Sequence, residues 1–277
     1  MVSTAWLAQR LDDPKIKVID ATLFMPGDPR DANALFQEAH IPGAVFFDIE
    51  DLSDHGSDLP HMLADADVFG DKVGRLGIGG GDTVVAYDGG YGLFSAARAW
   101  WNFRVMGHTE VYVLDGGLPR WRAEGRPVET GVASPKPARF EARLDLTLVR
   151  DIDQVRGLLA SRAEQVVDAR AAGRFEGATP EPRAGMRSGH MPGARNLPFT
   201  DLLENGGLKS RDALLEAFGA AGVDPNARLI ASCGSGVTAS VIALAMARLG
   251  LAGAAVYDGS WSEWGSRDDT AVVTGPA

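Results

Sequence analysis

Three short motifs occur twice in this chain at nearly the same spacing, and they divide it into two similar halves. The repeated pairs are Val18-Ile-Asp-Ala21 with Val166-Val-Asp-Ala169, His40-Ile-Pro-Gly-Ala44 with His190-Met-Pro-Gly-Ala194, and Leu114-Asp-Gly-Gly-Leu-Pro-Arg-Trp121 with Tyr257-Asp-Gly-Ser-Trp-Ser-Glu-Trp264. Several signals at a nearly constant offset indicate a duplicated domain.

Each half alternates short apolar strands with helices, which predicts an α/β domain with a mainly parallel sheet flanked by helices on both faces. The expected strands include 16–20, 83–87, 111–114, 166–169 and 229–231, and the expected helices include 3–11, 65–76, 95–106 and 237–249. We expect an N-terminal domain over 1–125, a linker rich in Pro, Gly, Ser and Glu over 126–145, and a C-terminal domain over 146–277.

Cys233, the only cysteine in 277 residues, lies between the apolar strand 229–231 and the helix 237–249, which Gly250 ends. Gly234 and Gly236 allow the sharp turn between them. Backbone N–H groups at a helix N-terminus favour an anion, so this position favours the thiolate. Most free cysteines are small buried hydrophobes, but a strand, a glycine-rich turn and a helix around Cys233 favour a nucleophile.

Composition excludes several classes of protein. The net charge of −10 argues against nonspecific nucleic-acid binding, and a single cysteine excludes an intramolecular disulfide and a cysteine-cluster metal site. The N-terminus lacks the pattern of a signal peptide, and no apolar run approaches the roughly 20 residues that span a bilayer. We therefore expect a cytoplasmic protein with no membrane partner.

The Cys233-Gly-Ser-Gly-Val-Thr-Ala239 loop resembles the active loop of the two-domain rhodanese family of sulfurtransferases, and within it the mercaptopyruvate branch. Tyr91-Gly-Leu-Phe-Ser-Ala-Ala-Arg-Ala-Trp-Trp101 and the repeated motifs extend the resemblance over nearly the whole chain. It implies tandem rhodanese-like domains and a ping-pong reaction. The Cys233 thiolate takes sulfur from 3-mercaptopyruvate, pyruvate leaves, and a thiol, a thioredoxin-like dithiol or cyanide accepts sulfur from the persulfide. It implies no metal and no organic cofactor.

The resemblance also implies the substrate-binding residues. Arg174 and Arg183 match the family's clamps on the substrate carboxylate and carbonyl, with Arg170 and Arg187 as nearby alternatives. A planar guanidinium suits a carboxylate. The loop residues Gly234, Gly236, Val237 and Thr238 would hold the substrate sulfur through their backbone N–H groups.

A proton relay is implied as well. Ser235 matches a serine that the mercaptopyruvate branch couples to a histidine and an acid of the first domain. The matching positions are His61 and Glu50, where the family commonly has aspartate, so neighbouring Asp51 competes with Glu50. The relay would polarise the keto oxygen or protonate the departing enolate.

Other interpretations are weaker. A cysteine phosphatase needs an arginine six residues after its cysteine, and Ala239 stands there. A thiosulfate:cyanide sulfurtransferase is the nearest rival, although a loop without Lys or Arg stabilises the thiosulfate dianion less well. A non-catalytic rhodanese-like module suits only the first half, where Asp88 aligns with Cys233. His40 and His190 occur in both halves, which favours a structural role for them.

Overall fold

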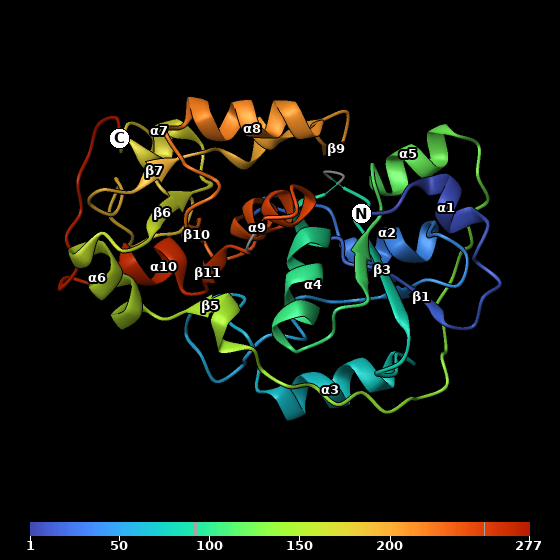
Figure 1. Cartoon of the computed structure of the whole chain (residues 1–277). Coiled ribbons are helices and arrows are strands. Elements are labelled where there is room, and N and C mark those ends of the chain that lie inside the picture. The colour runs from blue at the N-terminus through green and yellow to red at the C-terminus, as the bar shows by residue number, and fades with distance from the viewer. Residues whose placement is uncertain (91–92, 252) are drawn as a thin grey trace. The chain divides into compact units, whose positions relative to one another are not determined.

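The computed structural model describes residues 1–90, 93–251 and 253–277. These residues form two compact units (Figure 1). Unit 1 comprises Met1–His55, Leu63–Asp145 and Asn205–Gly207, and unit 2 comprises Gly56–Met62, Leu146–Glu204 and Leu208–Ala277. Tyr91 and Gly92, which begin the longest segment that carries the family resemblance, lie outside the described residues.

Unit 1 is built on a parallel sheet of four strands in the order β2-β1-β3-β4. Its strands are β1 (Ile16–Asp20), β2 (Val45–Phe46), β3 (Thr83–Tyr87) and β4 (Val111–Val113), and its helices are α1 (Thr4–Ala8), α2 (Ala32–Glu38), α3 (Ala66–Arg75), α4 (Phe94–Val105) and α5 (Gly117–Ala123). Helix α4 packs against β3 and β4 (Figure 1). The predicted strands 16–20 and 83–87 are confirmed without a shift.

Unit 2 is built on a parallel sheet of five strands in the order β5-β11-β10-β6-β7, and a small two-stranded sheet pairs β8 with β9. Its elements are η1 (Leu146–Leu148), β5 (Val149–Arg150), α6 (Ile152–Ser161), β6 (Gln165–Asp168), α7 (Ala172–Phe175), β7 (Arg195–Asn196), η2 (Phe199–Leu202), β8 (Leu203–Glu204), β9 (Gly207–Leu208), α8 (Arg211–Ala220), β10 (Leu229–Ser232), α9 (Ala239–Arg248), β11 (Ala255–Tyr257) and α10 (Ser260–Trp264).

The strand registers confirm the duplication. The last residue of β1, Asp20, is level with Tyr87 of β3, and the last residue of β6, Asp168, is level with Ser232 of β10. Both turn histidines are held in the same way, because Nδ1 of His40 lies 2.8 Å from the carbonyl oxygen of Phe36 and Nδ1 of His190 lies 2.9 Å from that of Phe175. Each imidazole also stacks on that phenylalanine. These contacts support a structural role for both histidines.

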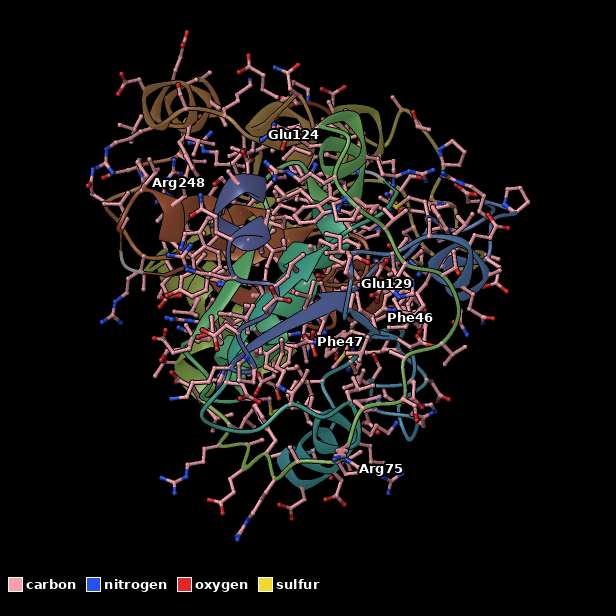
Figure 2. All side chains as sticks on the ribbon, turned by 90° about the vertical axis from the view of Figure 1, so that its right-hand side faces the viewer. Phe46, Phe47, Arg75, Glu124, Glu129 and Arg248 are labelled. Carbon is pink, nitrogen blue, oxygen red and sulfur yellow. The ribbon has the colours of Figure 1, made fainter. Side chains whose placement is uncertain are left out.

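The segment 126–145, expected as a linker, has no regular element but packs as part of unit 1. Phe140 is buried and its ring contacts Phe69, Phe103 and His108. Figure 2 labels Glu129 on this segment, and its carboxylate accepts a hydrogen bond from the Gly43 amide (2.9 Å). Burying an aromatic side chain stabilises by about 2–3 kcal/mol, so the chain from 126 to 145 is held against unit 1.

Two predicted helices are shorter than expected. The helix predicted over 3–11 spans only Thr4–Ala8, with Ser3 as its N-cap. The helix predicted over 237–249 begins at Ala239. Its two preceding residues form a tighter turn, since the amides of Ser240 and Val241 donate to carbonyls three residues back. The loop after Cys233 is thereby longer than the sequence suggested.

Candidate active site

Cys233 directly follows β10 and starts the loop that leads into α9. The side chain is buried, with 2% of the residue exposed. Gly236 has φ of +77°, a conformation that suits glycine, whereas Gly234 has no positive φ. The expectation that both glycines supply special backbone angles is therefore confirmed only for Gly236. Gly234 is needed for a different reason, which involves Arg174.

The start of α10 holds the cysteine in place. The amide of Cys233 donates to Ser260 Oγ (3.1 Å), and the carbonyl of Cys233 accepts from the Trp261 amide (3.0 Å). Ser262 donates through both its amide (2.8 Å) and its hydroxyl (2.7 Å) to the carbonyl of Gly234. Three successive residues of one helix thus fix the backbone on either side of the thiol.

Sequence reasoning missed the role of Ser260. Its φ of +49° is unusual for a residue with a side chain, and its hydroxyl also donates to the Tyr257 carbonyl (2.7 Å). A non-glycine residue in this region costs on the order of 1–3 kcal/mol. The repeated Asp-Gly pair before Ser260 was the available signal, but a motif does not show which backbone group the serine hydroxyl reaches.

The loop after Cys233 presents backbone donors. Among the residues that the structure describes, the N–H groups of Gly234, Ser235, Val237 and Thr238 have no hydrogen-bond acceptor. Successive free amides in a turn before a helix form a concave site for an anion. The side chains of Ser235 and Thr238 are both nearly buried. The arrangement can hold a sulfur anion without any cationic residue in the loop.

Arg174, in the last turn of α7, reaches this loop. A Cβ at position 234 would lie 3.1 Å from Nη2 of Arg174, so glycine there lets the guanidinium approach the backbone closely. Nε and Nη2 donate to the two carboxylate oxygens of Glu181 (3.2 and 2.5 Å). Nη1 has no acceptor within the described part of the chain. Glu181 therefore fixes the orientation of the guanidinium through Nε and Nη2, and Nη1 can still donate a hydrogen bond to a ligand.

The two alternative arginines are engaged elsewhere. Arg170 has a fully buried side chain that pairs with Asp168 (2.6 Å) and with Glu181 (2.8 Å). Arg187 donates to the backbone carbonyls of Trp264 (3.0 Å) and Gly265 (3.2 Å), at the end of α10. Arg170 thus neutralises two buried carboxylates and Arg187 caps a helix, so both guanidinium groups already have partners within unit 2.

Arg183 and His61 lie together within unit 2. Nη2 of Arg183 is 3.4 Å from Nε2 of His61, and only 7% of His61 is exposed. The sequence placed His61 in the first domain, but residues 56–62 belong to unit 2. The backbone of His61 has a positive φ of 61°, a strained conformation for a residue with a side chain.

Glu50 lies in unit 1, after β2, and is exposed. Its amide donates to the Asp48 carboxylate (2.9 Å). The carboxylate of its competitor Asp51 is paired with Lys72 (3.2 Å) on α3. Because Glu50 and His61 belong to different units, the relay through Ser235, His61 and Glu50 stays a prediction.

A comparison with known protein families identifies the fold. The rhodanese-like domain matches this chain twice, over residues 3–124 and 151–267. The chain belongs to the rhodanese family. Residues 125–150 lie between the two matched regions, and Cys233 lies in the second.

Named relatives within the rhodanese family match nearly the whole chain. The human 3-mercaptopyruvate sulfurtransferase is 45% identical over 270 residues, which cover 95% of this chain and 91% of the relative. The mouse thiosulfate sulfurtransferase is 46% identical over 271 residues, again 95% of this chain and 91% of the relative. The crystal structure of SseA from Escherichia coli, described as a 3-mercaptopyruvate sulfotransferase, has a TM-score of 0.87 at 41% identity and covers 94% of this chain and 98% of its own.

The first rhodanese-like domain carries a carboxylate where the second carries the thiol. The Asp88 carboxylate accepts from the Gly90 amide (2.6 Å) and from both the amide (3.3 Å) and the hydroxyl (2.5 Å) of Ser95 on α4. An internal anion therefore already occupies donors of this loop. This supports the expectation that the first domain is a catalytically inactive copy.

Within the described residues, no group of three or more His, Cys, Asp or Glu side chains is arranged to hold a metal ion. No helix among them is long and apolar enough to cross a bilayer.

Proposed function

We propose that this protein is a sulfurtransferase that moves sulfur from 3-mercaptopyruvate, through a Cys233 persulfide, to a thiol, a dithiol or cyanide. One observation carries the proposal: the buried Cys233 begins a loop whose free amides and whose neighbouring guanidinium, that of Arg174, suit an anionic sulfur donor with a carboxylate. The activities for which these relatives are named agree with this chemistry.

In the first half-reaction the Cys233 thiolate attacks the sulfur of 3-mercaptopyruvate. The new S–S bond forms as the C–S bond breaks, and its electron pair leaves on carbon as the enolate of pyruvate, which takes up a proton. Arg174 binds the carboxylate through Nη1 and Arg183 holds the keto oxygen, where charge develops. In the second half-reaction the acceptor attacks the outer sulfur and restores the thiolate.

The free amides of the loop then have a defined task. The outer sulfur of the persulfide carries negative charge, and the N–H groups of Gly234, Val237 and Thr238 stabilise it before the acceptor arrives. Ser235, His61 and Glu50 deliver the proton to the enolate in this scheme. If the sulfur acceptor is a protein, we expect it to be a thioredoxin-like protein that accepts the sulfur through its dithiol.

Thiosulfate is the competing donor, and identity alone does not separate the two donors, because the mouse thiosulfate sulfurtransferase is as similar to this chain as the human 3-mercaptopyruvate sulfurtransferase. The loop from Gly234 to Thr238 holds no Lys or Arg. The second negative charge of thiosulfate therefore has no cationic partner in the loop and is stabilised less well. We therefore place 3-mercaptopyruvate first.

Measuring kcat/KM for both donors on one preparation, with the same acceptor, decides between them. We expect a preference of at least tenfold for 3-mercaptopyruvate, and a preference for thiosulfate would contradict the choice of donor. Mass spectrometry after each donor should show one added sulfur atom on the Cys233 peptide. Added sulfur on another peptide, or none with either donor, would contradict the covalent step itself.

We also infer a cytoplasmic location, since a catalytic thiol needs a reducing compartment. Immunoblotting of fractionated cells tests this separately from the chemistry.

A further inference from the structure

Unit 1 contains a cavity of about 260 Å³ at the carboxyl end of β1, outside the site described above. Its lining includes the Asp20 carboxyl, Thr22, Ala39, Gly89 and Leu118, with Glu38 and Arg122 among the exposed residues that border it. Asp20 is only 2% exposed. A cavity of this size is far larger than one water needs and lies just below the roughly 300 Å³ at which ligand pockets begin.

The same place in unit 2 is filled by a guanidinium. Arg170 occupies it, pairing with Asp168 (2.6 Å), donating to the carbonyl of Gly189 (2.8 Å) and stacking on Trp261, with its Cζ 4.2 Å from the ring centroid. These three partners are an acid, a backbone carbonyl and an aromatic face. Together with the Glu181 carboxylate, which pairs with Nη1 of Arg170 (2.8 Å), they form the receptor for this planar cation.

Each of the first three partners has a counterpart in the lining of the unit 1 cavity. By the repeated motifs and the strand registers, Asp20 corresponds to Asp168, Ala39 to Gly189, and Leu118 to Trp261. The local backbone agrees, since the amide two residues after the acid bonds back to that carboxylate at 2.9 Å in both units. The acid and the backbone carbonyl are retained, whereas a leucine replaces the aromatic face and the guanidinium is absent from position 22.

Unit 1 has a cavity at this position because two of its residues are smaller than their counterparts in unit 2. Thr22 stands in place of Arg170, and Leu118 stands in place of the larger Trp261. The short Thr22 side chain bonds the near oxygen of Asp20 and accepts from the Gly89 amide (2.7 Å), so it stays at the floor of the cavity. A Cβ at Gly89 would lie 3.5 Å from Leu118 and 3.9 Å from the second oxygen of Asp20, so these groups face one small volume.

The electrostatics of the cavity favour a cation. Asp20 is the buried charge-bearing group, Asp88 lies close enough to raise its pKa further, and burial is the larger cause of that raised pKa. Tyr87 also bonds this carboxyl. Glu38 adds a negative charge near the opening and Arg122 a positive one. A cation beside Asp20 would offset the cost of burying the carboxylate.

We infer that the unit 1 cavity is a binding site for a small guanidinium group, which takes the place that the Arg170 guanidinium fills in unit 2. The guanidinium can come from a free alkylguanidine or from an arginine side chain of a peptide. Both present the same planar cation, and the cavity admits little more than that group with a short alkyl stem.

Isothermal titration and thermal unfolding of the full chain test the site, with methylguanidinium chloride as the probe. We expect one saturable site per chain and a rise in Tm at millimolar concentrations, whereas urea, a neutral molecule of similar shape, gives neither. The Asp20→Asn variant should bind at least tenfold more weakly. Absent or non-saturable binding, or binding unchanged in this variant, overturns the inference.

Two further measurements sharpen the result. Thr22→Arg fills the cavity from within and should abolish binding; if that variant does not fold, Thr22→Gln fills part of the same space and should weaken binding. Comparing agmatine with the acetyl-Gly-Arg-Gly-amide peptide identifies the source of the cation, because a tenfold preference for either one assigns the site to free alkylguanidines or to peptides. Binding that persists in full when the cavity is filled contradicts the location.

Discussion

The two units place the same strand, loop and helix around different chemistry. In unit 1 the position next to the Gly89 backbone is surrounded by Thr22, Leu118 and Asp20, whereas in unit 2 the equivalent position at Gly234 faces the Arg174 guanidinium. Unit 1 fills its loop with its own carboxylate, and unit 2 leaves loop amides free. A loop of backbone N–H donors can bind an anionic substrate only when no side chain of the protein already accepts from those donors.

A second contrast concerns the residue that anchors the loop. In both units the residue at the start of the last helix has a left-handed backbone, Gly117 with φ of 55° and Ser260 with φ of 49°. The next amide donates to the carbonyl of Asp88 (3.2 Å) in unit 1 and to that of Cys233 (3.0 Å) in unit 2. Unit 1 adopts this turn with a glycine. Unit 2 accepts the strain of a serine and gains a hydroxyl bonded to the Cys233 amide.

The largest effect is expected from giving unit 2 the carboxylate of unit 1. Cys233→Asp should lower sulfur transfer by on the order of 10³-fold or more, because the nucleophile is lost. The fold should persist, since unit 1 already accommodates a carboxylate in this loop. Activity assays and circular dichroism measure the two outcomes, with Cys233→Ser as the control that adds no charge.

The reciprocal exchange completes this test. Asp88→Cys in the Cys233→Ser background should stay inactive, because the atoms nearest a Cβ at Gly89 belong to Thr22, Leu118 and Asp20 and not to a guanidinium, and Gly117 provides no hydroxyl. Sulfur transfer by this double variant would mean that the inactivity of unit 1 rests on Asp88 alone.

Removing the buried guanidinium of unit 2 should have the next largest effect. Arg170→Thr copies Thr22 of unit 1 and leaves the buried carboxylates of Asp168 and Glu181 without their shared partner. Breaking a buried ion pair costs about 3–5 kcal/mol. Urea unfolding followed by circular dichroism measures the loss.

Two controls accompany the Arg170 variant. Arg156→Thr removes partly exposed pairs with Asp153 and Asp269, so it should cost no more than about 1 kcal/mol. Adding Asp168→Asn to Arg170→Thr should recover part of the lost stability. If Arg170→Thr costs no more than Arg156→Thr, the buried network is not what holds this part of unit 2.

The anchoring serine allows a test that separates strain from positioning. Ser260→Gly relieves the backbone strain but loses the hydrogen bond to Cys233, two effects of about 1 kcal/mol each and of opposite sign. The free energy of unfolding should therefore change little, while kcat/KM falls by about tenfold as the thiol loses its fixed position. Ser260→Ala keeps the strain and loses the bond, so it should lower both quantities. Full activity in both variants would contradict the proposal that the Ser260 hydroxyl positions Cys233 for the reaction.

The elements that the sequence predicted correctly are those with local signals. Strands 16–20 and 83–87 follow from their apolar runs, and the place of Cys233 between a strand and a helix follows from the apolar and glycine pattern around it, whereas its role as a nucleophile stays a prediction. Ser260 and Glu181 escaped prediction because their roles depend on contacts across unit 2, with a backbone amide in one case and with two arginines in the other. His61 lies in the stretch that matches the first rhodanese-like domain, but the short segment 56–62 groups with unit 2, and its sequence has no periodicity that would have indicated this.

The smallest effect is a pH dependence that distinguishes the two buried acids. Burial and nearby Asp88 raise the pKa of Asp20 above its ordinary value of 3.8. The folded protein therefore binds this proton more tightly than the unfolded chain does. The stabilising contribution is complete below the ordinary pKa and is lost as the pH rises through the folded-state pKa, by about 1.4 kcal/mol for every tenfold difference in proton affinity.

The Asp20→Asn variant makes this dependence measurable. Its amide oxygen can still accept from the Thr22 amide, but it carries no charge, so the variant should gain stability relative to the parent protein as the pH rises from 4 to 7. Thermal unfolding across this range gives the difference in Tm, and Asp12→Asn, at an exposed position, should show none. Asp168 has Arg170 as its partner, so Asp168→Asn should instead lose stability at neutral pH. Opposite signs for these equivalent acids would establish that the guanidinium, present in one unit and absent from the other, determines how each buried carboxyl is tolerated.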